Sequence, residues 1–433
     1  MSNQVRKILY ISPYFPPLNS SRSISNAYYC MELEKLGYKI IILTAEIPKD
    51  HIRYYNDDNQ WFKGEFKIKK VGLGLYGKFY TKKLIVIKRK KKNSIDNLKS
   101  YIKRIKVFKM FKGIVKDILF FPDSFIYWSK KSYFIANQLI NKYNPSVIIT
   151  ASEPNSVHIL GFRLKQNFPN IKWVGYFGDP WSLEPKLNTI QKIRHRRLEK
   201  KVICLMDKYV FTTKKTRDLY CKEFEIDIKK TSVFSRGYDP KVYNIYSSIS
   251  LDKNKLNFVY AGLIGENRNI LPFLKAVKNL KSFLSSKVNF YFIGDISSKL
   301  KIKFEEFKFI KLSGIVSFRE SIIYMKEADF LILFDNNESL QLPAKVFEYL
   351  GTTNPIITVT MNFTSPLCEL MREADRGPII YNRKNDIEEI LKKIINLYND
   401  IQIPGKWRSL NDKYEIGNVV LNFAKENLNF NKN

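Results

Sequence analysis

The chain has 433 residues, of which 45% are hydrophobic and 27% charged, with 18 glycines and 17 prolines. These proportions indicate two or three globular domains, and they exclude a disulfide-stapled miniprotein, a collagen and a largely disordered chain. Lysine and arginine number 74 against 41 acidic residues, which gives a net charge of +33. A charge of that size predicts an anionic partner, such as a nucleic acid, an acidic membrane surface or a phosphorylated substrate.

Cysteine spacing and hydropathy bear on the cellular compartment. The four cysteines are scattered without a C-x-x-C pair, so neither a disulfide framework nor a zinc site is predicted. The apolar run at residues 5–11 is interrupted by Arg6 and Lys7 and followed by Pro13, which favours a first strand over a signal peptide. Apolar runs also stay shorter than the roughly 18 to 20 residues that a membrane-spanning helix needs. We therefore expect a cytoplasmic protein with peripheral membrane contact.

Short apolar, β-branched runs alternate with helical patterns along both halves of the chain. This alternation is typical of βαβ units around a parallel sheet with both faces covered. We expect an α/β protein with two Rossmann-like domains facing across a cleft. The predicted strands are residues 7–14, 39–44, 146–150 and 172–177 in the first half, and 257–261, 288–293, 310–312, 330–334 and 356–359 in the second.

Residues 235–250 lack periodicity, contain Arg-Gly-Tyr-Asp-Pro and end in a serine-rich tail, which is typical of a connection between domains. We therefore predict an N-terminal domain at 1–236, a linker at 237–254, a C-terminal domain at 255–405 and a helix at 406–433 that packs back on the N-terminal domain. The spacing of Ser317 and Glu320 is that of a capping box, which predicts a helix start there.

The most specific motif is L-P-A-K-V-F-E-Y-L-G at residues 342–351, followed by N-P-I-I at 354–357. It resembles a segment of glycosyltransferase family 4, the retaining GT-B enzymes that use nucleotide-sugar donors. The resemblance implies that Pro343, Lys345 and Glu348 bind the donor. Glu348 would hold the ribose, since a carboxylate accepts two hydrogen bonds from a vicinal diol, and Lys345 would meet the diphosphate. The alternative is an i,i+3 surface pair on a helix.

A second segment, Y-A-G-L-I-G-E-N-R ending at Arg268, is similar to the strand, loop and helix that open the family's donor domain. Gly262 and Gly265 would let the backbone approach a phosphate, and Arg268 would neutralise the leaving diphosphate. Gly294 and Gly314 end later strands, where a nucleotide would lie against the backbone. The alternative for the first two glycines is a plain turn before an ordinary helix.

The acceptor side of the resemblance lies in the first half of the chain. Ser20, Ser21 and Arg22 occupy the loop after the first strand, and their hydroxyls, N–H groups and charge can hold an oxyanion. Asp179, in F-G-D-P-W, stands where relatives carry a residue proposed to orient or deprotonate the acceptor. His158 is the second candidate base. The alternatives are a turn or N-cap aspartate and a packed helical histidine.

Leu340 departs from the family pattern, because many members carry a second glutamate eight positions before the ribose-binding one. Leu340 and the small number of histidines disfavour a GT-B sugar-nucleotide epimerase, which would need acids and a base around the donor sugar. The E-x-D at residues 225–227 lies in a polar stretch, so no metal site is predicted. We expect no cofactor besides the donor substrate, linked to UDP or GDP.

The stretch from Lys78 to Lys116 contains 15 basic residues and one acidic residue. Within it, apolar residues recur at helical spacing and the cations lie largely off that stripe, which is the pattern of an interfacial amphipathic helix. We predict a basic amphipathic segment at 78–120 that faces an anionic membrane. The alternative is a core helix with a solvated lysine face. The membrane-facing candidates are Lys103, Arg104, Phe108 and Phe111.

Together these features predict a retaining hexosyltransferase-like, metal-independent enzyme of bacterial surface polysaccharide or glycolipid assembly. The donor would bind to the C-terminal domain and a lipid-linked or saccharide acceptor to the N-terminal one, at the inner face of the cytoplasmic membrane. Charge at Arg268 and Lys345 would stabilise the leaving group, without a protein nucleophile. A nucleic-acid-binding protein is the alternative from another class, although no module for it is recognisable and no nucleic acid is expected. A catalytically degenerate GT-B binding protein is the third possibility.

Overall fold

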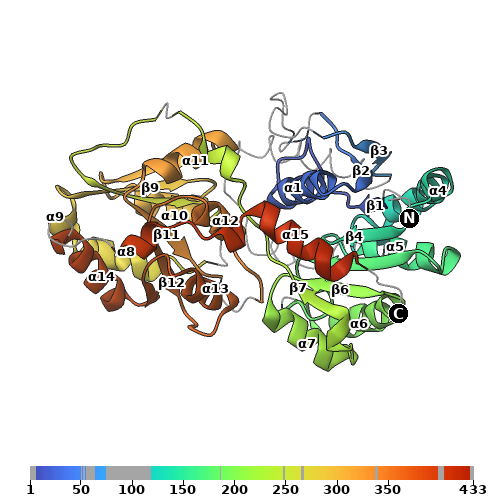
Figure 1. Cartoon of the computed structure of the whole chain (residues 1–433). Coiled ribbons are helices and arrows are strands. Elements are labelled where there is room, and N and C mark those ends of the chain that lie inside the picture. The colour runs from blue at the N-terminus through green and yellow to red at the C-terminus, as the bar shows by residue number, and fades with distance from the viewer. Residues whose placement is uncertain are drawn as a thin grey trace, which may run out of the picture. The chain divides into compact units, whose positions relative to one another are not determined.

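A computed structural model describes residues 6–49, 51, 54, 64–74, 119–185, 187–246, 249–264, 268–336, 340–397 and 404–429. Internal contacts divide these residues into two compact units. Unit 1 takes the described residues up to 212, together with 216–234 and those from 420 on, and unit 2 takes 213–215 and the described residues of 235–419. Each unit is built around its own parallel sheet (Figure 1).

Unit 1 contains a seven-stranded sheet in the order β3-β2-β1-β4-β5-β6-β7, and neighbouring strands pair in parallel. The strands are β1 Lys7–Ile11, β2 Lys39–Glu46, β3 Lys67–Gly72, β4 Val147–Ala151, β5 Lys172–Phe177, β6 Lys208–Phe211 and β7 Thr231–Val233. The helices are α1 Ser21–Lys35, α4 Ile126–Tyr143, α5 Ser156–Asn167, α6 Thr189–Ile203, α7 Lys214–Phe224 and α15 Ile416–Asn427. Trp128, Trp173 and Trp181 are buried in the core on one face of the sheet.

Unit 2 contains a six-stranded parallel sheet in the order β10-β9-β8-β11-β12-β13. Its strands are β8 Leu256–Ala261, β9 Val288–Ile293, β10 Ile310–Gly314, β11 Phe330–Phe334, β12 Ile356–Thr360 and β13 Ile379–Tyr381. Its helices are α8 Leu271–Asn279, α9 Lys281–Leu284, α10 Ser298–Phe304, α11 Phe318–Glu327, α12 Lys345–Leu350, α13 Pro366–Ala374 and α14 Lys384–Leu397. Phe258 packs on one face and Val259 on the other, so both faces of the sheet are covered.

Arg376 is a fully buried cation of unit 2, and its guanidinium forms hydrogen bonds with backbone carbonyl oxygens. Its guanidinium donates to the carbonyls of Leu350, Thr352, Asn354 and Trp407, at distances of 2.6–3.1 Å. Because Leu350 ends α12, the arginine also meets the negative end of that helix dipole. Burial lowers the pKa of Arg376 to about 10. These bonds join the end of α12 to the chain that precedes the last helix.

The predicted fold class, with two parallel α/β domains, is confirmed. The strands β5, β9 and β11 have the predicted bounds, and the capping box of Ser317 and Glu320 is present at the start of α11. The prediction did not include β3, β6, β7 and β13. In β3 the side chains of residues 67–70 are exposed and three are lysines, so this edge strand carries little apolar pattern to recognise.

The residues that were expected to form the linker and the returning helix divide differently between the units. Residues 235–254 belong to unit 2, where the amide of Tyr238 donates to the carbonyl of Tyr414 at 2.9 Å. Residues 406–419 also belong to unit 2, and only those from 420 on join unit 1. In α15, drawn in red in Figure 1, Phe423 packs edge-on against Tyr29 and Phe234 of unit 1. Among the described helices none is long and apolar enough to cross a membrane.

Candidate functional site

Three glycines lie side by side at the carboxyl edge of the unit 2 sheet. Gly262, Gly294 and Gly314 follow or end β8, β9 and β10, and all three have positive φ angles. The amide of Gly294 donates to the carbonyl of Gly314 at 2.7 Å, and a Cβ on Gly294 would lie 2.3 Å from the carbonyl oxygen of Gly262. Only glycine fits this close approach, so the chain segments after β8 and β9 pack backbone against backbone at this edge. Gly265 lies outside the described residues.

Arg268 lies beside this glycine edge. Its guanidinium donates to the carbonyl of Leu263 at 2.7 Å and to Oδ1 of Asn336 at 3.2 Å, and it also bonds to the hydroxyl of Tyr260. A Cβ on Gly262 would lie 3.3 Å from Nη1 of Arg268. The structure therefore brings together Arg268 and the glycine that the same sequence motif predicted.

Asp335 is a buried acid that the sequence analysis did not select. Its carboxylate accepts hydrogen bonds from Thr360 Oγ1 at 2.8 Å, from Ser365 Oγ at 2.6 Å and from the amide of Asn336 at 2.8 Å. Burial raises its pKa, and these hydrogen bonds oppose that shift. Asp335 thereby joins the ends of β11 and β12 to the start of α13, and it positions Asn336, which contacts Arg268.

Lys345 and Glu348 form an ion pair on α12, and both side chains are half-buried. The ammonium of Lys345 also lies 3.3 Å from Ser321 Oγ. The next residue, Tyr349, fastens this helix to the sheet, because its hydroxyl accepts from the amide of Ala261 at 2.7 Å and donates to the carbonyl of Ile332 at 3.2 Å. Tyr349 thus fixes α12 to the strand that leads into Gly262. The ion pair matches the i,i+3 alternative, and Tyr349 ties the helix that carries it to β8 and β11.

In unit 1, Ser20 caps a helix and Arg22 is buried beside Gly178. Ser20 is the N-cap of α1 and accepts from the amide of Ser23 at 3.2 Å, while Ser21 begins the helix. Arg22 is buried, and its guanidinium occupies the space that a side chain on Gly178 would take. Among the described residues, Nη1 of Arg22 has no hydrogen-bond partner. The arginine therefore faces the end of β5, where Asp179 follows Gly178.

Glu153 is a second acidic residue at this edge that the sequence analysis did not select. It follows β4, the strand that pairs with β5, and the amide of Gly178 donates to Ser152 Oγ at 3.2 Å. Burial and the neighbouring Asp179 raise the pKa of Glu153, and Arg22 opposes that shift. Glu153 therefore favours its protonated form beside Asp179.

His158 is fully buried in α5. Its Nδ1 lies 2.9 Å from Thr150 Oγ1, and its ring packs 4.5 Å from that of Phe177. Burial lowers the pKa of His158 to about 3. This environment matches the packed-histidine alternative, because a base must reach the acceptor hydroxyl. We therefore drop His158 as a candidate base.

The loop after Asp179 is fixed by a buried network around Glu199. The carboxylate of Glu199 accepts from the amide of Ser182 at 2.9 Å and from the hydroxyl of Tyr220 at 2.6 Å. The same hydroxyl accepts from the amide of Trp181 at 2.8 Å, and the Trp181 indole lies 2.8 Å from His195 Nδ1. Burial raises the pKa of Glu199 to about 7. The network holds the backbone directly after the candidate base.

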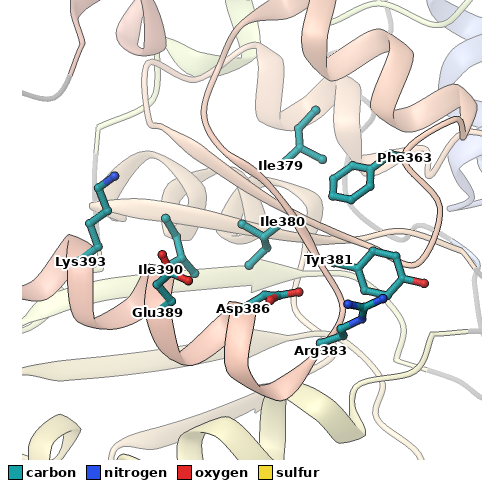
Figure 2. A pocket seen from close by; sticks show the side chains of 9 residues that line it. All are labelled: Phe363, Ile379, Ile380, Tyr381, Arg383, Asp386, Glu389, Ile390 and Lys393. Atoms are coloured by element: carbon teal, nitrogen blue, oxygen red, sulfur yellow. The ribbon is translucent and has the colours of Figure 1, made fainter.

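A cavity of about 600 Å³ lies elsewhere in unit 2, between β13 and α14. Figure 2 shows its apolar side chains, among them Phe363, Ile379 and Ile380, next to charged groups of α14. The guanidinium of Arg383 lies 4.2 Å from the centre of the Tyr381 ring. The lining includes none of the residues that the sequence analysis selected, so this cavity is separate from the glycine edge.

Several predictions fall on residues outside the described ranges. These are Gly265 and most of the basic segment 78–120, including Lys103, Arg104, Phe108 and Phe111. Within the described ranges, no group of three or more His, Cys, Asp or Glu side chains is arranged to hold a metal ion.

Neither a protein-family model nor a curated protein matches the chain. Its fold is nevertheless similar to solved structures over almost its whole length. Anabaena HepE in complex with UDP and glucose has a TM-score of 0.60 and 9% identity, covering 97% of this chain and 98% of that one. WaaG, a glycosyltransferase involved in lipopolysaccharide biosynthesis, has a TM-score of 0.53 and 10% identity, covering 96% and 95%.

A putative UDP-N-acetylglucosamine 2-epimerase from Listeria monocytogenes has a TM-score of 0.57 and 10% identity, covering 97% of this chain and 95% of that one. At such identities the likeness shows the fold and leaves the reaction open. Together with the two parallel sheets, these similarities show that the chain has the GT-B fold, which it shares with glycosyltransferases such as WaaG.

Proposed function

We propose that the chain is a retaining glycosyltransferase resembling family 4, which moves a sugar from a UDP- or GDP-linked donor to an acceptor. The observation that carries this proposal is the edge of unit 2, where Gly262, Arg268 and the pair Lys345–Glu348 lie on elements fastened to one another. Bare backbone, two cations and one carboxylate are what a nucleoside diphosphate requires.

The donor roles follow from charge and geometry. Glu348 would accept hydrogen bonds from the ribose hydroxyls, and the diphosphate would draw Lys345 away from its ion pair with Glu348. Arg268 and Lys345 would then neutralise the charge that develops on the leaving diphosphate, so the proposed reaction is independent of a metal ion. Gly294 and Gly314 would let the nucleotide lie against the backbone.

In unit 1, Asp179 would orient the acceptor hydroxyl, and the departing diphosphate would assist in removing the proton of that hydroxyl. Glu153 and Arg22 set the charge around Asp179. We further propose a lipid-linked or saccharide acceptor of bacterial surface polysaccharide or glycolipid assembly, reached from the inner face of the cytoplasmic membrane. The net charge of +33 supports the proposal that the enzyme acts at an acidic membrane surface.

The proposal is tested by thermal unfolding of the wild type and of Glu348→Ala with UDP, GDP, ADP and CMP. A ligand that binds only the folded state raises the stability by RT ln(1 + [L]/Kd), so one diphosphate should raise the wild-type midpoint and the variant should lose that response. Glu369→Ala, an exposed acid on α13, is the matched control and should respond like the wild type. If no nucleotide stabilises the wild type, the donor site is wrong and a degenerate or nucleic-acid-binding GT-B protein becomes the better interpretation.

A further inference from the structure

Helix α6 of unit 1 carries surface chemistry that neither the donor nor the acceptor proposal uses. Its exposed cations are Lys192, Arg194, Arg196, Arg197, Lys200 and Lys201. Its one acidic residue, Glu199, is buried and bonded to Ser182 and Tyr220. The surface of α6 therefore presents positive charge without an acidic side chain of its own.

Two isoleucines at the start of the same helix are exposed: Ile190 by 72% and Ile193 by 49%. At 100° per residue they lie on the same side of the helix as Arg194, Arg197 and Lys201. We call these five residues the α6 face. Aliphatic side chains that continue into a row of cations are typical of a helix lying in the boundary between lipid headgroups and acyl chains.

Residues 119–121, where the described chain resumes, contact α6 beside this face. The ring of Phe121 lies 4.9 Å from that of His195 in α6, and the guanidinium of Arg194 lies 4.4 Å from the centre of the same ring. Leu119, two residues earlier, is exposed by 53%. The described chain therefore resumes, after residue 118, next to the α6 face.

The composition of the α6 face favours lipid over nucleic acid. Single-stranded nucleic acid is held by cations together with aromatic side chains on which bases stack. The exposed apolar side chains of α6 are isoleucines, and the nearest ring, Phe121, is already covered by Arg194 and His195. Aliphatic groups gain more by entering a bilayer than by facing a base.

We propose that the α6 face docks the protein on an anionic phospholipid bilayer, with Ile190 and Ile193 inserted below the headgroups and Arg194, Arg197 and Lys201 on the lipid phosphates. This inference rests on the proposed function in one respect: docking on a membrane would bring the protein close to a membrane-associated acceptor. Vesicle binding needs no sugar, and nucleotide stabilisation needs no lipid, so the two proposals fail in separate experiments.

The test uses the full chain and its co-sedimentation with phosphatidylcholine vesicles, with and without phosphatidylglycerol. Reversal of the three cations (Arg194→Glu, Arg197→Glu, Lys201→Glu) should lower the affinity for phosphatidylglycerol vesicles by at least about a hundredfold, because the loss of each cation near an anionic surface is worth about fivefold and each glutamate adds repulsion. The matched control reverses three exposed lysines of unit 2, changing net charge equally. It carries Lys275→Glu, Lys281→Glu and Lys301→Glu.

A second pair of variants tests insertion. Ile190→Asp with Ile193→Asp should weaken vesicle binding by about tenfold or more, whereas the same change at the exposed Ile302 and Ile315 of unit 2 should leave it unchanged. Unfolding midpoints should match the wild type, because the replaced side chains are exposed. The proposal is overturned if the α6 and control reversals weaken vesicle binding equally, or if the Ile190 and Ile193 changes leave it unchanged. It is also overturned if the α6 variants bind vesicles like the wild type but bind single-stranded RNA more weakly.

Discussion

Glu199 offers the sharpest test of the electrostatics of unit 1. The pKa of this carboxyl is raised from 4.5 to about 7 by burial. Between these two values the folded chain holds a proton that the unfolded chain releases, so the free energy of unfolding falls as the pH rises. The free energy of unfolding falls by about 3 kcal/mol between pH 4.5 and pH 7. Below pH 4.5 both states are protonated, so the raised pKa of Glu199 makes the free energy of unfolding no lower there.

The perturbation is Glu199→Gln, a neutral side chain of the same shape that can still accept from the amide of Ser182. Relative to the wild type, the free energy of unfolding of this variant should increase by about 3 kcal/mol from pH 4.5 to pH 8. The assay is urea unfolding followed by tryptophan fluorescence, because Trp128, Trp173 and Trp181 are buried in unit 1.

Tyr220→Phe provides the second arm of this experiment. The Tyr220 hydroxyl bond lowers the pKa of Glu199, so its removal should extend the fall in stability to higher pH. Parallel pH profiles for Glu199→Gln and the wild type would refute the reasoning, since they would show that the pKa of Glu199 is the same in the folded and the unfolded chain.

Three further changes are expected to destabilise unit 2. Gly294→Ala should cost about 2 kcal/mol or more, because its φ is +131° and the new Cβ would lie 2.3 Å from the carbonyl oxygen of Gly262; unchanged urea unfolding would contradict the described backbone. Arg376→Met should cost about 3 kcal/mol by leaving three buried carbonyls and the half-buried carbonyl of Trp407 without their donor, and a thermal midpoint equal to the wild type would show that water replaces it. Ser317→Ala should cost about 1 kcal/mol through loss of the α11 cap, and calorimetry should show Ser317→Asp close to the wild type.

Some elements were predictable because their signal is local. The runs that form β5, β9 and β11 are almost continuously apolar, as strands covered on both faces must be, so their bounds could be set from neighbouring residues. The pattern of Ser317 and Glu320 likewise completes its hydrogen bonds within one helical turn. The short, lysine-rich β3 lacks such a signal, because its place in the sheet depends on pairing with β2.

The site was predictable only where residues act through a recognised motif. Asp335 acquires its role from Thr360 and Ser365, and Glu153 from Asp179, all of them at least 25 residues away in the chain. No local spacing marks such pairs, because the parallel sheets bring strand ends together through long crossovers. His158 shows the converse error, since a residue type suited to catalysis was selected without knowledge of its burial.

The course of the chain through α15 has a consequence for synthesis. Unit 1 needs residues on both sides of unit 2: Phe423 covers Tyr29 and Phe234, and the carbonyl of Leu428 accepts from Arg6 at 3.0 Å. A ribosome therefore delivers all of unit 2 before unit 1 can close. Until Phe423 is synthesised, Tyr29 and Phe234 lack this contact, so the nascent unit 1 exposes aromatic surface that a chaperone can bind.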